Sequence, residues 1–147
     1  MAWITPITDR NKSDVDYAKT HADSVEDNKG AFNCSDLNRI EGNCEYIRQE
    51  LNKYGYVIFI TTKTDWSMTD FPYKSELDRI RSNIEKLIDA YYELEGSPAM
   101  EFTTSLSWED ANSLEKNLKN LKIILDRMIN GFRYCGTFAC GQELILP

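Results

Sequence analysis

The stretch Ser35-Asp36-Leu37-Asn38-Arg39-Ile40-Glu41-Gly42-Asn43-Cys44 decides the fold, because two later stretches align with it without a gap. These stretches are 75–84 and 109–118, which follow at offsets of 40 and 34 residues. Asparagines and apolar residues fall in register in all three. A period of this length is typical of helical repeat units. The sequence therefore predicts an internal repeat.

Apolar residues recur at alternating steps of three and four in each repeat, which places them on one stripe of an α-helix. Charged residues and asparagines fill the opposite faces, so each helix is expected to bury one side. The pattern predicts helices over about 35–54, 75–95 and 108–130. The three stripes are Leu37, Ile40, Cys44, Ile47, Leu51 and Tyr54; Leu77, Ile80, Ile84, Leu87, Tyr91 and Leu94; and Ala111, Leu114, Leu118, Leu121, Leu125, Met128 and Phe132.

The ends of these helices carry the expected punctuation. Ser75 with Asp78, and Ser107 with Asp110, match a capping pattern in which a hydroxyl and a carboxylate satisfy first-turn N–H groups. Gly96 follows the second helix and Gly131 interrupts the end of the third. A shorter N-terminal helix is expected from Ser13 to about Val25.

The connectors predict a small β element. The segment from Tyr56 to Thr62 is rich in β-branched and aromatic residues and is interpreted as a strand. Phe102, Thr104 and Leu106 alternate like a short extended piece, and Thr137 to Leu146 fits a hairpin or an extended tail. We therefore expect one mainly α domain over 1–147: an antiparallel bundle of three long repeated helices plus a short N-terminal helix. Small β-strand or hairpin additions and extended terminal segments complete this expectation.

Composition narrows the class of protein. The chain has 147 residues and a formal net charge of −7, with 41% hydrophobic and 28% charged residues, which is an ordinary globular balance. An acidic chain without a basic run argues against a nucleic-acid partner. The longest apolar run, Val57–Ile60, is far below the roughly 20 residues that span a bilayer, so no membrane partner is expected. No secretory signal is visible at the start, which predicts synthesis in the cytoplasm.

No motif for chemistry emerges. Cys34, Cys44, Cys135 and Cys140 lack zinc-site spacing, and we expect four reduced, partly buried thiols, although a disulfide between the two regions stays open. The only histidine, His21, has no nucleophile motif nearby. The acidic residues are interpreted as solvated helix surface, and the chain has no Gly-rich phosphate loop, HExxH or EF-hand loop. We expect no cofactor, no metal and no enzyme.

Two sets of polar residues are candidates for structural or interface roles. Asn43, Asn83 and Asn117 each precede a core position, where a carboxamide can bond the backbone of a connector or of a partner helix. A shared ligand site is the alternative for these residues. Arg39 and Arg79 occupy matched positions and are expected on exposed helix surface, paired with nearby acids. An inter-subunit contact is the sharper alternative.

Aromatic residues gather near the connectors. Among them, Trp66 and Trp108 are interface candidates, and Phe71, Tyr73 and Phe132 belong to the same set. We expect such residues first to cap the ends of the bundle. A protein interface is the second interpretation and sugar binding the third.

Several stretches resemble one family of modules. Ile7-Thr8-Asp9-Arg10 and residues 29–41 resemble modules in tail- and baseplate-associated proteins of bacteriophages and prophages of Gram-positive bacteria. Lys63-Thr64-Asp65-Trp66 with the helix start 78–83, and the C-terminal 134–147, continue the resemblance over almost the whole chain. The third repeat departs from it, with Ser113-Leu114 in place of Arg-Ile.

The resemblance implies a non-enzymatic structural component of a virion tail or baseplate, with other tail proteins as partners and no catalytic residues to carry over. A homo-oligomer is a further expectation. An extended Gln142–Pro147 tail is expected to add to a neighbour's sheet edge or to dock in a groove. The alternatives are a receptor- or glycan-binding module at the tail tip and, after it, a cell-wall-degrading enzyme.

Overall fold

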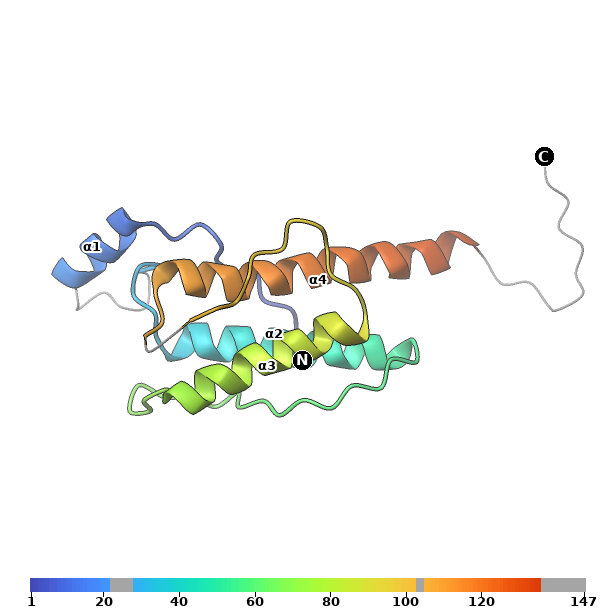
Figure 1. The fold of residues 1–147 in the computed structure, drawn as a ribbon, viewed down its shortest axis with the longest axis horizontal. Helices are drawn as coiled ribbons and strands as arrows, with labels where there is room; N and C mark the ends of the chain where they lie inside the picture. Colours follow the sequence, from blue (N-terminus) through green and yellow to red (C-terminus); the bar gives the residue numbers. More distant parts are fainter. Residues whose placement is uncertain (22–27, 103–104, 136–147) are drawn as a thin grey trace, which may run out of the picture.

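The structure is a computed structural model that describes residues 1–21, 28–102 and 105–135. Within these ranges it contains the helices α1 (Lys12–Thr20), α2 (Cys34–Lys53), α3 (Lys74–Ala90) and α4 (Trp108–Cys135). Figure 1 shows α2, α3 and α4 packed side by side, with α1 set apart at one end. The chain is therefore mainly helical, as the apolar stripes predict.

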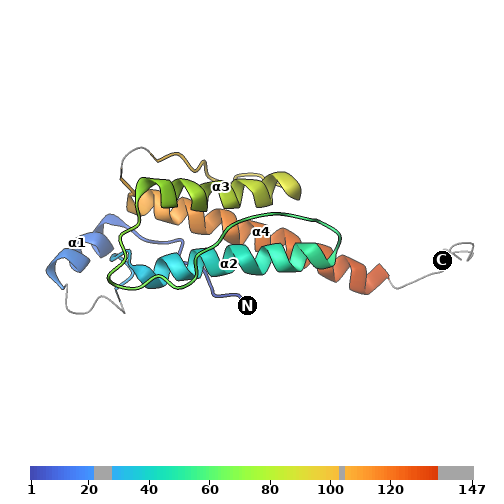
Figure 2. The ribbon, with the colours of Figure 1, turned by 90° about the horizontal axis from the view of Figure 1, so that it is seen from below.

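The three long helices run parallel, and the predicted antiparallel arrangement is wrong. Arg39 near the start of α2 contacts Glu115 near the start of α4, whereas the Tyr91 hydroxyl, just after α3, donates to the carbonyl of Ile124 late in α4. Figures 1 and 2 show the same direction for all three helices. The connectors 54–73 and 91–107 are long enough to return along a helix, because the 20 residues of α2 span only about 30 Å.

The predicted apolar stripes form the core. Each long helix contributes residues that are almost fully buried, such as Ile40 from α2, Ile84 from α3 and Leu118 from α4. The last members of two stripes, Tyr54 and Phe132, lie at the end of the bundle, where their partly exposed rings stack at 5.5 Å between centroids. The core is also closed by two connector residues, Ile58 and Trp66.

No β-strand occurs in the described ranges, so the strand predicted over Tyr56–Thr62 is wrong. This segment lies against helices, which offer no free backbone ladder, and side chains bind its backbone instead. Phe102 and Leu106 are not in a strand either, and the Thr137–Leu146 prediction lies outside the described residues. The β-branched residues of this segment lie in an extended stretch of chain that packs on the helical core and does not pair with another strand of the described ranges.

The helix ends follow the predictions only in part. The Ser107–Asp110 cap is confirmed, since Asp110 N–H donates to Ser107 Oγ at 3.1 Å and Ser107 N–H donates to Asp110 Oδ2 at 2.8 Å. The Ser75–Asp78 cap is wrong, because α3 begins at Lys74 and its N-cap Tyr73 makes no side-chain cap bond. Capping boxes occur instead before α1 and α2, at Asn11 and Asn33.

Three helix lengths also differ from the predictions. Helix α3 ends at Ala90, before the predicted limit of 95, and α4 continues through Gly131 to Cys135. Helix α1 ends at Thr20 and buries none of its residues. No helix in the described ranges is long and apolar enough to cross a membrane.

Candidate functional site

A buried ion cluster joins the starts of α2 and α4. The two oxygens of Glu115 accept from Nε and Nη2 of Arg39 at 2.8 and 2.7 Å, and Asp36 Oδ1 also binds Arg39 Nη2. Glu115 is fully buried and Arg39 is nine-tenths buried. Arg39 is predicted on exposed helix surface, paired with nearby acids. The predicted exposure is wrong, whereas the pairing occurs with the buried carboxylates of Asp36 and Glu115.

Arg10, from the N-terminal segment, completes this cluster. Its Nη2 lies 2.8 Å from Asp36 Oδ1 and 2.9 Å from Glu115 Oε1. Two guanidinium groups therefore face two carboxylates, which leaves the cluster neutral. Burial lowers the pKa of Arg39, but hydrogen bonds and the charges of Glu115 and Asp36 outweigh burial and raise that pKa. The cluster holds its charges inside the protein.

A second cluster joins α3 to α2 through the same helix positions. Arg79 Nη1 and Nη2 donate to Glu41 Oε2 and Oε1 at 2.6 and 2.7 Å, and Glu41 is fully buried. The hydrogen bond to Glu41 raises the pKa of Arg79, and a further bond to Glu76 adds to it although burial opposes it. The Trp66 Nε1–H and the Lys63 backbone N–H donate to the same Glu41 carboxylate, at 2.9 and 2.7 Å.

The three candidate asparagines bind the backbone of segments outside the helices: Asn43 binds the N-terminal segment, and Asn83 and Asn117 bind connectors. Asn43 accepts from Ile4 N–H at 3.0 Å and donates to the Ile4 carbonyl at 2.7 Å. Asn83 makes the same pair of bonds to Thr61, at 3.4 and 2.7 Å. Asn117 donates to the Pro98 carbonyl at 2.8 Å, and proline has no N–H to complete the pair.

Sequence reasoning missed two asparagines with the same geometry. Asn38 binds both backbone groups of Trp66, at 2.8 and 2.9 Å, and Asn112 binds both backbone groups of Arg10, at 3.1 and 2.8 Å. Asn38 and Asn112 occupy matching places in the aligned stretches, as do Glu41 and Glu115. That register was the available signal for all four residues. Asn38 thus holds a connector, and Asn112 the N-terminal segment, against the long helices.

The two candidate tryptophans lie in different settings. Trp66 is only 6% exposed, and the Lys63 ammonium lies 4.1 Å from its ring centroid. The Trp66 ring therefore makes its contacts within the protein. Trp108 is the half-buried first residue of α4 rather than part of a connector.

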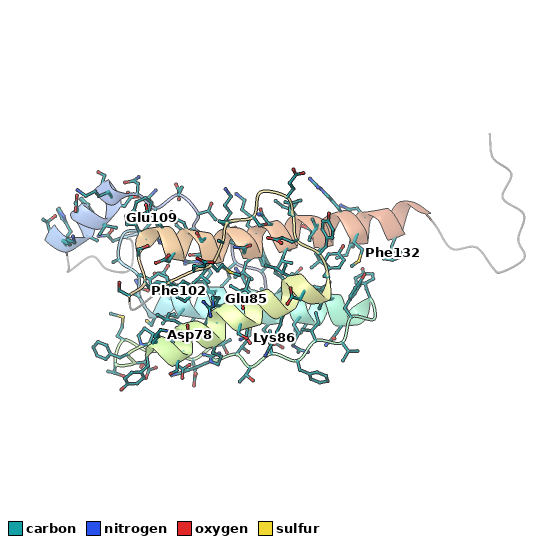
Figure 3. All side chains as sticks on the ribbon, in the orientation of Figure 1. Asp78, Glu85, Lys86, Phe102, Glu109 and Phe132 are labelled. Carbon is teal, nitrogen blue, oxygen red and sulfur yellow. The ribbon has the colours of Figure 1, made fainter. Side chains whose placement is uncertain are left out.

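An exposed apolar patch lies at the end of the bundle where the helices begin. It consists of Met68, Phe71 and Tyr73, of which Phe71 is 80% exposed. Beside it runs a groove of about 260 Å³ whose apolar lining comes from Phe32, Cys34, Leu37, Met68, Phe71 and Pro72. We call this the start groove, because α2 and α3 begin there. Figure 3 labels Glu109 near the start of α4 and Phe132 near its opposite end.

The described residues offer no assembled metal site or catalytic constellation. They contain no group of three potential metal-ligating side chains. His21 stacks on Tyr17 of its own helix region at 3.9 Å between centroids. Cys44 is a buried free thiol whose pKa is raised, first by burial and then by the charge of Glu41, and Cys34 is free in the start groove. The arrangement can hold chain segments and present apolar surface.

Comparisons with protein-family models, with curated proteins and with solved structures found no match to this chain.

Proposed function

We propose that this chain is a non-enzymatic structural component of a bacteriophage or prophage-derived tail or baseplate, and that it acts through protein–protein contacts. The resemblance of its helix starts to such modules suggests the particle. The exposed patch of Met68, Phe71 and Tyr73 is the observation that carries the contact role. Apolar groups of this size, gathered beside a groove, are typical of surfaces that another protein covers.

The buried charges support a structural role rather than a reactive one. Arg10, Asp36, Arg39 and Glu115 form one neutral cluster, and Glu41 with Arg79 forms the centre of another. Their hydrogen bonds are directed at each other and at connector backbone. A general acid or base needs a proton that it can exchange with a bound substrate, and these carboxylates are closed off by guanidinium and N–H donors.

The alternative of glycan binding at the tail tip is supported only by exposed aromatic rings such as Phe71 and Tyr73. Trp66 is not available to a sugar, because it is buried and its Nε1–H donates to Glu41. A glycan array with no bound sugar removes this alternative. Zymography on host peptidoglycan, in which we expect no clearing, tests the wall-degrading enzyme.

The decisive experiment places the protein in or outside the particle. Particles produced with wild-type protein, with Phe71→Asp or with Phe59→Asp are purified and their proteins quantified by mass spectrometry. Phe59 is a matched control, because it is 83% exposed and also lies in a connector, outside the patch. We expect wild type and Phe59→Asp in purified tails and loss of Phe71→Asp. A wild-type protein found only in the free fraction contradicts the proposal.

A further inference from the structure

The start groove has a mainly apolar lining, with Asn33, Ser67 and Asp70 as its polar members, and no occupant among the described residues of the chain. Its volume of about 260 Å³ accommodates one or two large apolar side chains. The thiol of Cys34 and the side chain of Leu37 form its α2 wall, and Met68, Phe71 and Pro72 form the wall that precedes α3. Because Phe71 is 80% exposed, the folded chain does not gain the free energy that burial of a phenylalanine supplies, about 1.5–3 kcal/mol.

We propose that the start groove binds residues 137–146 of a second copy of this chain. The proposal rests on the assembly function proposed above and names the chain itself as one of its partners. Two features of the chain support this binding: the apolar sequence of residues 137–146 and the position of Cys135, where α4 ends.

The composition of the segment matches the groove. Residues 137–146 include Phe138, Leu144, Ile145 and Leu146, and Glu143 is their only charged residue. Such a segment gains free energy when apolar side chains leave water, at about 25 cal/mol per Å². The start groove offers six apolar side chains beside the polar Asn33, Ser67 and Asp70, so apolar side chains of the segment can leave water there.

The position of the segment favours a second copy over the same copy. Helix α4 passes beyond the end of α2 and ends at Cys135, at the end of the bundle opposite the start groove (Figure 1). The Arg39–Glu115 pair places the first turns of α2 level with those of α4. The groove therefore lies about 35 Å back along the bundle from Cys135, at 1.5 Å per residue. Even a fully extended chain brings Phe138 at most about 11 Å and Leu144 about 32 Å from Cys135. Only the last two residues of the segment, Ile145 and Leu146, reach about 36 and 40 Å, so the groove of the same copy cannot take the segment as a whole.

A contact of this kind is heterologous, because the groove and the segment are different surfaces of the chain, and the groove lies at the end of the bundle opposite the end of α4. Each copy then offers one free groove and one free segment, so that contacts repeat into rings or filaments. Repeated contacts of modest strength are strengthened by multivalency in such an assembly. The apolar groove at one end of the bundle thus has a partner in the apolar sequence that follows α4.

The test uses the purified full-length chain under reducing conditions, followed by sedimentation velocity over a range of concentrations. Three variants are compared with wild type: Phe71→Asp in the groove, Leu144→Asp in the segment and Phe59→Asp as the matched exposed control. We expect wild type and Phe59→Asp to associate. Each of the other two variants alone should lose association by about tenfold or more, as for central interface residues.

Mixing the two defective variants distinguishes head-to-tail binding from other contacts. Phe71→Asp keeps an intact segment and Leu144→Asp keeps an intact groove, so the mixture should form a one-to-one dimer that neither variant forms alone. A monomeric wild type overturns the proposal, as does a mixture that stays monomeric or an equal loss in Phe59→Asp. Binding of the segment to its own groove yields monomers throughout and overturns it too. Self-association is measured without particles, so its result is independent of whether the protein occurs in tails.

Discussion

The carboxylate of Glu115 on α4 binds the guanidinium of Arg39 on α2 at 2.8 and 2.7 Å, and the pair lies away from water. Arg79 and Glu41 repeat the relationship between α3 and α2. In the aligned stretches, both arginines hold the fifth place and both glutamates the seventh. An arginine at the fifth place of one helix and a glutamate at the seventh place of a neighbouring helix therefore form the contact in both helix pairs, which fixes both pairs in the same parallel register.

Replacing Glu115 with Gln should destabilise the protein strongly. The change leaves Arg10 and Arg39 facing Asp36 alone, and an uncompensated buried charge costs about 3–5 kcal/mol. Denaturant unfolding measures the loss, with Glu109→Gln as an exposed control near the start of the same helix. A loss below about 1 kcal/mol would show that the cluster is solvated rather than buried.

Replacing Asn83 with Ala should cost about 1–3 kcal/mol, because Thr61 loses partners for both backbone groups. Asn117→Ala should lower the free energy of unfolding by less than Asn83→Ala does, because Pro98 loses a partner only for its carbonyl. Thermal or denaturant unfolding of both variants, beside the exposed Asn130→Ala, ranks the three. Equal values for Asn83→Ala and Asn130→Ala contradict a bond that holds the connector.

The pairing of an arginine at the fifth place with a glutamate at the seventh place occurs twice, and substitutions can introduce it a third time. Between α4 and α3, the fifth place is Ser113 and the seventh is Arg81, so the aligned stretches place no glutamate opposite an arginine there. We expect Ser113→Arg and Arg81→Glu to destabilise the protein singly and to compensate each other when combined. A double-mutant cycle should yield a favourable coupling on the order of 1 kcal/mol. No coupling would show that α3 and α4 do not meet in the register of the other two pairs.

Alkaline pH should weaken the fold through Cys44. Burial raises the pKa of this thiol, so the unfolded chain releases the proton at lower pH than the folded chain does. Stability is then complete below the unfolded pKa of about 8.5 and falls above it, by up to about 1.4 kcal/mol per pH unit. Urea unfolding between about pH 8 and 9.5 measures the slope. Cys44→Ala should have a smaller slope over the same range, and an unchanged slope contradicts the assignment.

Two glycines should respond to alanine in opposite directions. A Cβ on Gly30 would lie 2.0 Å from the backbone oxygen of Asp14, so Gly30→Ala should displace α1 from the turn and cost about 1–3 kcal/mol. A Cβ on Gly131 meets nothing within 4 Å inside α4, and Gly131→Ala should stabilise the helix by about 0.5–1 kcal/mol. Thermal unfolding of the two variants checks both signs. A destabilised Gly131→Ala would show that α4 ends before that residue.

The sequence predicts those residues of the candidate site that stand out at matching places of the three aligned stretches. Asn43, Asn83 and Asn117 were recognised because a carboxamide beside each stripe stands out in three aligned stretches. Glu41 and Glu115 stand in equal register, but acidic residues on a helix are ordinarily solvated, so their burial was not predicted. The start groove joins residues 32–37 to residues 67–72, and only packing brings these two segments together.

The sequence alone determined the helices and the faces that they bury, because a side chain's place on a helix follows from the 3.6-residue period without knowledge of any neighbour. It did not determine their direction, since an apolar stripe packs equally well against a parallel or an antiparallel partner. Only the tertiary structure decided that α2, α3 and α4 run parallel, with Asn38 and Asn83 binding the connector between α2 and α3 and Asn112 binding the N-terminal segment. That outcome depends on which carboxylates, guanidinium groups and backbone groups satisfy one another across distances of up to 108 residues in the chain, and such pairing has no local signature.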